Sequence, residues 1–210
     1  MLIATILSQN TNDKNSHRAY ADLRRRYLAW KDVAHARVGR IASAIRMGGM
    51  AQQKSARIKE TLAEIRTRYG RYSLSALRRL PDSDVIDELT QFNGVGVKTA
   101  ACVLLFSLGK DVFPVDTHVH RICNRLGLAN GSKLPEHTFE MMKRLVPKGR
   151  AYTLHTNLIR FGRKVCRSQN PACDICPLYD ECSYEGKQKR RGVKRPATNV
   201  DHDFMLLDNV

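Results

Sequence analysis

A tight glycine turn opens directly into an apolar helical run near the middle of this 210-residue chain. Two glycines one residue apart allow backbone conformations closed to other residues and let a ligand come close. A helix N-terminus presents free N–H groups and a partial positive charge. The stretch therefore predicts an anion site, most simply for a phosphate, at the start of a helix. The turn is Gly94-Val95-Gly96, and the apolar positions that follow at helical spacing are Ala100, Val103, Leu104 and Leu108.

Lys98 lies in the first turn of this expected helix, and Asp116 follows Pro114 at a sharp re-entry of the chain. The helix dipole and neighbouring cations favour a neutral amine at such a lysine. A neutral amine beside a carboxylate can perform Schiff-base chemistry. Spacing alone favours a simpler interpretation, in which Lys98 contacts phosphate and Asp116 caps the next helix, because Gly-x-Gly turns before helices are common.

The chain is strongly basic, with 36 Lys and Arg against 20 Asp and Glu, a formal net charge of +16 and a pI of about 9.9. Nucleic acid is the first candidate partner for such an excess. No apolar stretch is long enough to predict a transmembrane helix, and residues 1–7 lack the length and basic start of a signal peptide. We expect a protein without membrane attachment that is cytoplasmic with the chromosome, or nuclear if eukaryotic.

Four of the six cysteines form a compact cluster in the sequence, spaced C-x6-C-x2-C-x5-C. Four thiolates this close together can surround one tetrahedral ion or one cubane cluster. On chemistry alone zinc and [4Fe–4S] compete, and zinc is the commoner structural choice. The cluster comprises Cys166, Cys173, Cys176 and Cys182, whereas Cys102 and Cys123 lie in apolar helical runs and are expected to be core thiols.

The remaining chain shows helical periodicity, no strand pattern and no repeat of 20–50 residues, which predicts an all-α fold. Asp13 is the expected cap of an early helix, and residues 82–84 are expected to cap the first helix of the hairpin. A basic run at 187–195, followed by an acidic end, predicts a disordered tail over 187–210. The main expected helices are residues 13–27, 50–69, 84–91, 117–126, 135–146 and 150–164.

Residues 92–118 resemble the helix-hairpin-helix and the following Gly/Pro-rich loop of the endonuclease III family of DNA repair glycosylases. Residues 94–100 and 115–118 match the family pattern Gly-Val-Gly-x-Lys-Thr-Ala and Val-Asp-Thr-His, whereas Phe92-Asn93 replaces Leu-Pro. The resemblance covers residues 1–184 and implies two all-α lobes. One is a six-helix barrel lobe at about 1–110 with the hairpin at about 84–108, and the other, at 111–186, ends in an iron–sulfur cluster loop. The family's N-terminal helix has no counterpart here, so the first helix is expected to be missing.

The same resemblance implies a monomeric DNA glycosylase with abasic-site lyase activity, acting on double-stranded DNA that carries a damaged base or an abasic site. Oxidised pyrimidines are the family's usual lesions. Lys98 would attack the sugar, and Asp116 would deprotonate the lysine or stabilise positive charge on the sugar. The hairpin residues Gly94, Val95 and Gly96 would hold a phosphate, and Thr117 and His118 would contact DNA. The cysteine spacing matches that of the family's [4Fe–4S] cluster.

Two further segments resemble the parts of the family that open the duplex. Asn10 aligns with the side chain that fills the gap left by an extruded nucleotide, and the neighbouring Gln9 could take that role instead. Met50, in a Gly-x-x-x-x-Lys segment that ends at Lys54, aligns with an apolar wedge on the opposite side. The simpler interpretation of Met50 is a buried residue at the start of a helix.

Three alternatives remain. The first is a monofunctional mismatch glycosylase of the same superfamily, which Lys98 argues against because adenine-mismatch relatives lack a lysine there. The second is a DNA-binding module without catalysis, which would bind DNA in a salt-sensitive way and form no covalent intermediate. The third is a zinc-stabilised interaction protein.

Overall fold

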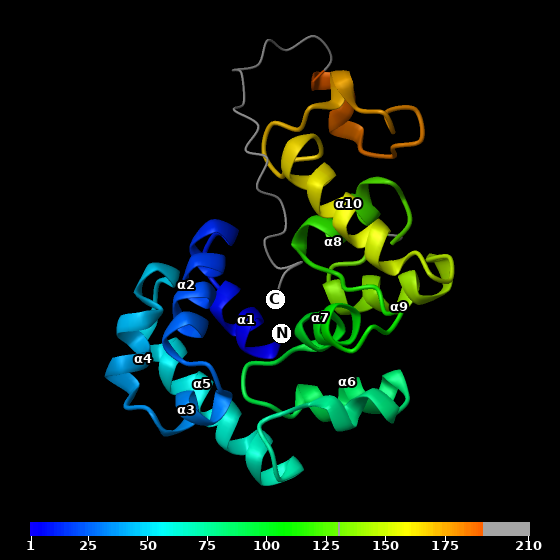
Figure 1. The fold of residues 1–210 in the computed structure, drawn as a ribbon. Helices are drawn as coiled ribbons and strands as arrows, with labels where there is room; N and C mark the ends of the chain where they lie inside the picture. The colour runs from blue at the N-terminus through cyan, green and yellow to red at the C-terminus, as the bar shows by residue number, and fades with distance from the viewer. Residues whose placement is uncertain (130, 191–210) are drawn as a thin grey trace. The chain divides into compact units, whose positions relative to one another are not determined.

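The structure is a computed structural model that describes residues 1–129 and 131–190. The chain divides into two compact units, Met1–Lys110 and a second that begins at Asp111. The described residues form α-helices and short 3-10 helices and contain no strand (Figure 1). The predicted all-α class is confirmed.

Unit 1 contains seven α-helices, whereas the resemblance implies a lobe of six. The helices α2, α4 and α5 pack side by side, and α6 and α7 form the hairpin (Figure 1). Two 3-10 helices, η1 (Arg46–Gly48) and η2 (Ser75–Arg79), join them. The α-helices are α1 (Leu2–Ser8), α2 (Asp13–Arg26), α3 (Trp30–His35), α4 (Val38–Ala44), α5 (Ala51–Tyr69), α6 (Asp82–Thr90) and α7 (Val97–Ser107).

The core of unit 1 comes from apolar side chains on one face of each of its first five α-helices. The short helix α1 is buried along most of its length, and the carbonyl of Leu7 near its end accepts from the Lys54 ammonium of α5. Burying such aliphatic side chains contributes about 1.5–3 kcal/mol each, so this cluster positions the loops between the helices. Its members are Ile3, Ile6, Leu7, Ala19, Leu23, Val33, Ile41, Ile45, Ile58 and Leu62.

Two of the expected helix caps differ in the structure. The helix α2 begins at Asp13, but the side chain that caps it is Asn12, whose oxygen accepts from the backbone N–H of Asn15 at 2.8 Å. The helix α6 begins at Asp82, after Pro81, so Asp82 and Asp84 lie in its first turn rather than before it. Carboxylates in a first turn still stabilise the helix through its dipole.

Unit 2 contains α8 (Thr117–Arg125), α9 (Pro135–Leu145) and α10 (Ala151–Lys164), followed by the 3-10 helices η3 (Cys173–Ile175) and η4 (Glu185–Arg190). The helices α8 and α10 cross closely at Gly162, where an added Cβ would lie 2.9 Å from the Cβ of His118. Only a glycine allows this approach.

The prediction of a disordered tail is wrong for its first residues, 187–190. Residues 185–190 form η4, and the Lys187 ammonium donates to the carbonyls of Tyr179 and Cys182 at 2.8 and 2.6 Å. Lys187 therefore closes the cysteine-containing loop instead of starting a tail. The rest of the predicted tail, residues 191–210, lies outside the described residues.

Among residues 1–129 and 131–190, no helix is both long enough and apolar enough to cross a membrane.

Candidate active site

The hairpin between α6 and α7 has the predicted turn, but its two glycines serve different purposes. Gly94 has φ +75°, a left-handed conformation that favours glycine. Gly96 is extended, with φ −93° and ψ 176°, and is the N-cap of α7. Nothing lies within 4 Å of a Cβ placed on Gly96, so this position leaves open space for a ligand. Val95 between them is buried and anchors the turn.

Lys98 is the second residue of α7 and is exposed. The seven residues that follow it, Thr99 to Leu105, are all buried, so this part of the helix is enclosed on every side while Lys98 in the first turn is exposed. The first N–H groups of a helix have no partner within the helix. The arrangement places an accessible amine beside backbone donors and the positive end of the helix dipole.

Asp116 is the N-cap of α8, because its Oδ1 accepts from the backbone N–H of Val119 at 2.8 Å. The simpler interpretation of the sequence predicted that Asp116 caps the next helix, and this contact confirms the cap. The preceding loop is held by His155, which is buried and whose Nδ1 lies 2.9 Å from the carbonyl oxygen of Pro114. Asp111 also accepts from the backbone N–H groups of Gly149 and Ala151. Asp116 belongs to unit 2 and Lys98 to unit 1, and the catalytic roles of both stay predictions.

Thr117 and His118 follow Asp116 in the first turn of α8. Thr117 is exposed, and His118 is half-buried. Burial lowers the pKa of His118, and the carboxylate of Asp116 partly offsets this effect. One nitrogen of the Arg121 guanidinium lies 3.1 Å from Nδ1 of His118 and donates to the carbonyls of Gly162 and Cys166 at 3.0 and 2.8 Å.

Gln9, Asn10 and Met50 line a single cavity of about 230 Å³ in unit 1. Asn10 Nδ2 lies 4.0 Å from Sδ of Met50, although 40 residues separate them in the chain. Both residues have left-handed backbones, with φ of 52° and 49° respectively. Met50 is 50% exposed, so its simpler interpretation as a buried residue is wrong. Gln53, Lys54 and Arg57 of α5 complete the lining.

Gln9 differs from Asn10 because its side-chain amide is occupied at both ends. Its Nε2 donates to the carbonyl of Gly94 at 3.2 Å, and its Oε1 accepts from Arg57 at 3.2 Å. A Cβ on Gly94 would lie 2.7 Å from that same Arg57 guanidinium. Arg57 and Gln9 therefore join the turn of the hairpin to the end of α1, a contact that the sequence did not reveal.

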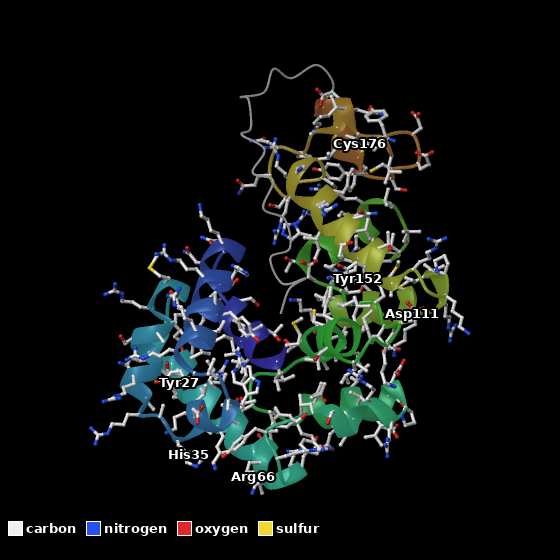
Figure 2. All side chains as sticks on the ribbon, in the orientation of Figure 1. Tyr27, His35, Arg66, Asp111, Tyr152 and Cys176 are labelled. Carbon is white, nitrogen blue, oxygen red and sulfur yellow. The ribbon has the colours of Figure 1, made fainter. Side chains whose placement is uncertain are left out.

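The four clustered cysteines line one small cavity in unit 2, together with Arg125, Pro171, Ala172 and Tyr184. Figure 2 shows Cys176 in the segment that follows α10. No group of three or more His, Cys, Asp or Glu side chains in the described part of the chain is close enough to share one metal ion. Thiolates around a single zinc ion all lie about 2.3 Å from it, and hence close to one another. The four cysteines therefore share one cavity, but their side chains do not form a single-ion site in this structure.

Arg125 connects α8 to the cysteine-containing loop. Its guanidinium donates to Sγ of Cys166 at 3.3 Å and to the carbonyl of Arg167 at 2.8 Å, and lies 4.3 Å from the ring centroid of Tyr184. Its own carbonyl accepts from the backbone N–H of Ser183 at 2.8 Å. Arg121 and Arg125 were missed at the sequence level, although their spacing of four residues places them on one face of a helix.

Cys102 and Cys123 are 5% and 0% exposed, which confirms them as core thiols. Burial raises the pKa of Cys123 to about 11, so this thiol is protonated at neutral pH.

Comparison with known proteins gives consistent results. The family model that describes HhH-GPD superfamily base excision DNA repair proteins matches residues 3–148. Endonuclease III of Thermotoga maritima is 38% identical over 192 residues, which cover 91% of this chain and 84% of the relative. The solved structure of a trapped endonuclease III–DNA covalent intermediate has a TM-score of 0.76 and 28% identity, and covers 90% of this chain and 84% of that one. A thermostable thymine-DNA glycosylase gives a TM-score of 0.73 at 26% identity, covering 89% and 83%.

Proposed function

Because the chain belongs to the HhH-GPD superfamily of base excision DNA repair proteins and is a DNA glycosylase of the endonuclease III class, we propose that it also cleaves abasic sites through a Schiff base on Lys98. The observation that carries the proposal is the exposed Lys98 in the first turn of α7, directly after the glycine turn. The likeness to a trapped endonuclease III–DNA covalent intermediate supports a covalent mechanism. The proposed substrate is double-stranded DNA that contains either a damaged base or an abasic site. The damaged base is proposed to be an oxidised pyrimidine, the usual lesion of the family.

DNA binding begins at the hairpin. The N–H groups at the start of α7 and the open space beside Gly96 receive a phosphate. The damaged nucleotide leaves the helical stack at a cost of a few kcal/mol, which is least for weakened pairs. Asn10 fills the space that the nucleotide leaves, and Met50 inserts into the duplex as an apolar wedge on the opposite side. The contacts of Gln9 with Gly94 and Arg57 favour Asn10 over Gln9 as the gap-filling residue.

The chemistry proceeds through the Lys98 amine. Asp116 takes a proton from the ammonium, and the freed Nζ attacks C1′ of the sugar. The bond between C1′ and the base breaks, and the base leaves with the electron pair and gains a proton. The sugar ring then opens to a Schiff base. Loss of a proton from C2′ expels the 3′ phosphate by β-elimination, and water hydrolyses the Schiff base to release Lys98.

Cys166, Cys173, Cys176 and Cys182 are proposed to hold a [4Fe–4S] cluster. The proposal is supported by the four thiols, which line one cavity, and by their spacing C-x6-C-x2-C-x5-C, since four thiolates can surround one cubane cluster. When bound, the cluster supplies a covalent cross-link. The chain's own residues close the site, since Arg125 contacts Cys166 and Lys187 contacts the carbonyl of Cys182.

Replacing Cys176 with serine is expected to remove the visible absorbance and the iron of the purified protein, because one of the four thiolates is lost. The segment that follows α10 is expected to become sensitive to protease, since metal binding there is also folding energy. Metal analysis and limited proteolysis measure both effects. Cys102→Ala is the matched control and should retain its iron, because Cys102 is a core thiol in unit 1. Zinc in the wild-type protein would contradict the cluster and favour a zinc site.

We also propose that the protein acts as a monomer beside the chromosome, in the cytoplasm or, in a eukaryote, in the nucleus. A net charge of +16 supports association with DNA through phosphate neutralisation.

A monofunctional mismatch glycosylase is the second candidate, because the likeness to a thymine-DNA glycosylase is nearly as high as that to endonuclease III. That enzyme class would remove a base with water as nucleophile and leave no covalent adduct.

Borohydride trapping tests the proposal. The wild-type protein is incubated with a duplex that has one abasic site, reduced, digested and analysed by mass spectrometry. The expected result is a sugar adduct on the peptide that contains Lys98. Binding without an adduct would overturn the lyase proposal and leave the monofunctional glycosylase or the non-catalytic module.

A further inference from the structure

Lys54 is a buried lysine near the start of α5, only 5% exposed. Its Nζ donates to the carbonyls of Leu7 at 2.8 Å and Gly48 at 2.6 Å. Burial lowers the pKa of Lys54, and no carboxylate partner for it occurs within residues 1–129 and 131–190. Burying a cation without a counter-charge costs several kcal/mol, whereas an apolar side chain would fill the same space without that cost. The two hydrogen bonds are therefore the reason for a lysine at this position.

The two carbonyls precede the two predicted duplex-opening residues. Leu7 lies in the last turn of α1, where carbonyls lack helical partners, three residues before Asn10. Gly48 ends η1, two residues before Met50.

Asn10 and Met50, which we call the two loop tips, both have backbone conformations that non-glycine residues rarely adopt. Asn10 has φ 52° and Met50 has φ 49°, and Gly49 before Met50 has φ 67°. Left-handed conformations of this kind are unfavourable for residues other than glycine and persist only when the surroundings impose them. The close packing of η1 on α2 supplies part of this restraint, because a Cβ on Gly48 would lie 3.1 Å from Cβ of Ala19.

We propose that Lys54 is a positioning residue that holds Asn10 and Met50 at the separation needed to enter the duplex together. The single ammonium of Lys54 donates to a backbone carbonyl close to each loop tip, Leu7 for Asn10 and Gly48 for Met50. The two loop tips are therefore expected to move together. The inference rests on the proposed function, because it requires that Asn10 and Met50 enter DNA. Lys54 itself is not proposed to contact DNA, and it affects duplex opening only by positioning Asn10 and Met50.

The test uses a duplex with a non-reactive abasic analogue and 2-aminopurine on the opposite strand, whose fluorescence rises when the base unstacks. Lys54→Met keeps most of the side-chain length and removes all the donors. We expect the fluorescence equilibrium to shift toward the stacked state about tenfold, while affinity for undamaged duplex changes less than about twofold. A tenfold shift corresponds to about 1.4 kcal/mol, which the loss of hydrogen bonds from a charged group can account for.

Lys59→Met is the matched control. Lys59 lies five residues later on α5, is partly buried and donates to the carbonyl of Ala36 at 2.6 Å, away from both loop tips. This variant should lose thermal stability but keep the wild-type fluorescence response. If Lys54→Met fails to fold, Lys54→Gln, which keeps one amide donor group, replaces it in the same assay.

A double-mutant cycle separates positioning from a general loss of stability. In a background carrying Asn10→Ala and Met50→Ala, Lys54→Met is expected to have no further effect on fluorescence. An equal loss in both backgrounds, or the same response from Lys54→Met and Lys59→Met, would overturn the positioning role. If the wild-type protein binds the duplex without any fluorescence rise, the proposed duplex opening fails, and the role of Lys54 fails with it.

Discussion

Replacing Lys98 with glutamine is expected to abolish borohydride trapping and strand cleavage while the protein remains folded and still binds DNA. Glutamine cannot form a Schiff base, and no other group of the hairpin replaces the amine. Loss of a covalent nucleophile lowers turnover by about 10³-fold or more. Single-turnover cleavage of an abasic duplex and gel analysis of the trapped adduct measure the effect.

The fold should tolerate this change well. Lys98 is exposed, and the buried residues of α7 that follow it are untouched. Lysine and glutamine have similar helix propensities, so we expect stability to change by less than about 0.5 kcal/mol. The loss of activity can therefore be assigned to chemistry.

Lys14→Gln is a matched control for the lost positive charge. Lys14 is also an exposed lysine at the second position of a helix in unit 1, in this case α2. This variant should trap and cleave like the wild type, with at most a small, salt-dependent loss of binding. Trapping that persists in Lys98→Gln would identify another amine as the nucleophile and disprove the role assigned to Lys98.

Asp116→Asn is expected to lower base excision by about 10²–10⁴-fold, the usual contribution of a positioned acid or base. The structure shows that Asp116 also caps α8 by accepting from the N–H of Val119. Asparagine is as good an N-cap as aspartate. The substitution therefore keeps the cap and removes the charge and basicity, so the two roles can be separated.

Thermal unfolding and single-turnover excision should be measured together for Asp116→Asn and Asp116→Ala. The alanine variant is expected to lose about 1 kcal/mol of stability with its cap, whereas the asparagine variant should unfold close to the wild type. Both should lose excision. If Asp116→Asn excises bases at the wild-type rate, capping is the whole role of Asp116.

The helices, the glycine turn and the cysteine spacing were accessible from the sequence because each depends on residues within a few positions of one another. The apolar periodicity of α5, α8, α9 and α10 placed these helices to within about two residues. Gly94 needs its left-handed conformation because of the turn that contains it. The errors at Asn12 and Asp82 are also local, since several polar residues in a row can each cap a helix and only the backbone geometry selects among them.

Tertiary structure alone decided the contacts between residues distant in the chain. Gln9 bonds Gly94 across 85 residues, Lys54 joins Leu7 to Gly48, and Arg125 reaches Cys166 across 41 residues. Periodicity and turn chemistry report which face of a helix is buried, but not which helix covers it or at what depth. A lysine therefore reads as a surface charge in the sequence, and only packing reveals Lys54 as a buried donor beneath two loops. The sequence by itself determined the all-α fold, the family and the residues proposed for chemistry, whereas packing determined how those residues are held.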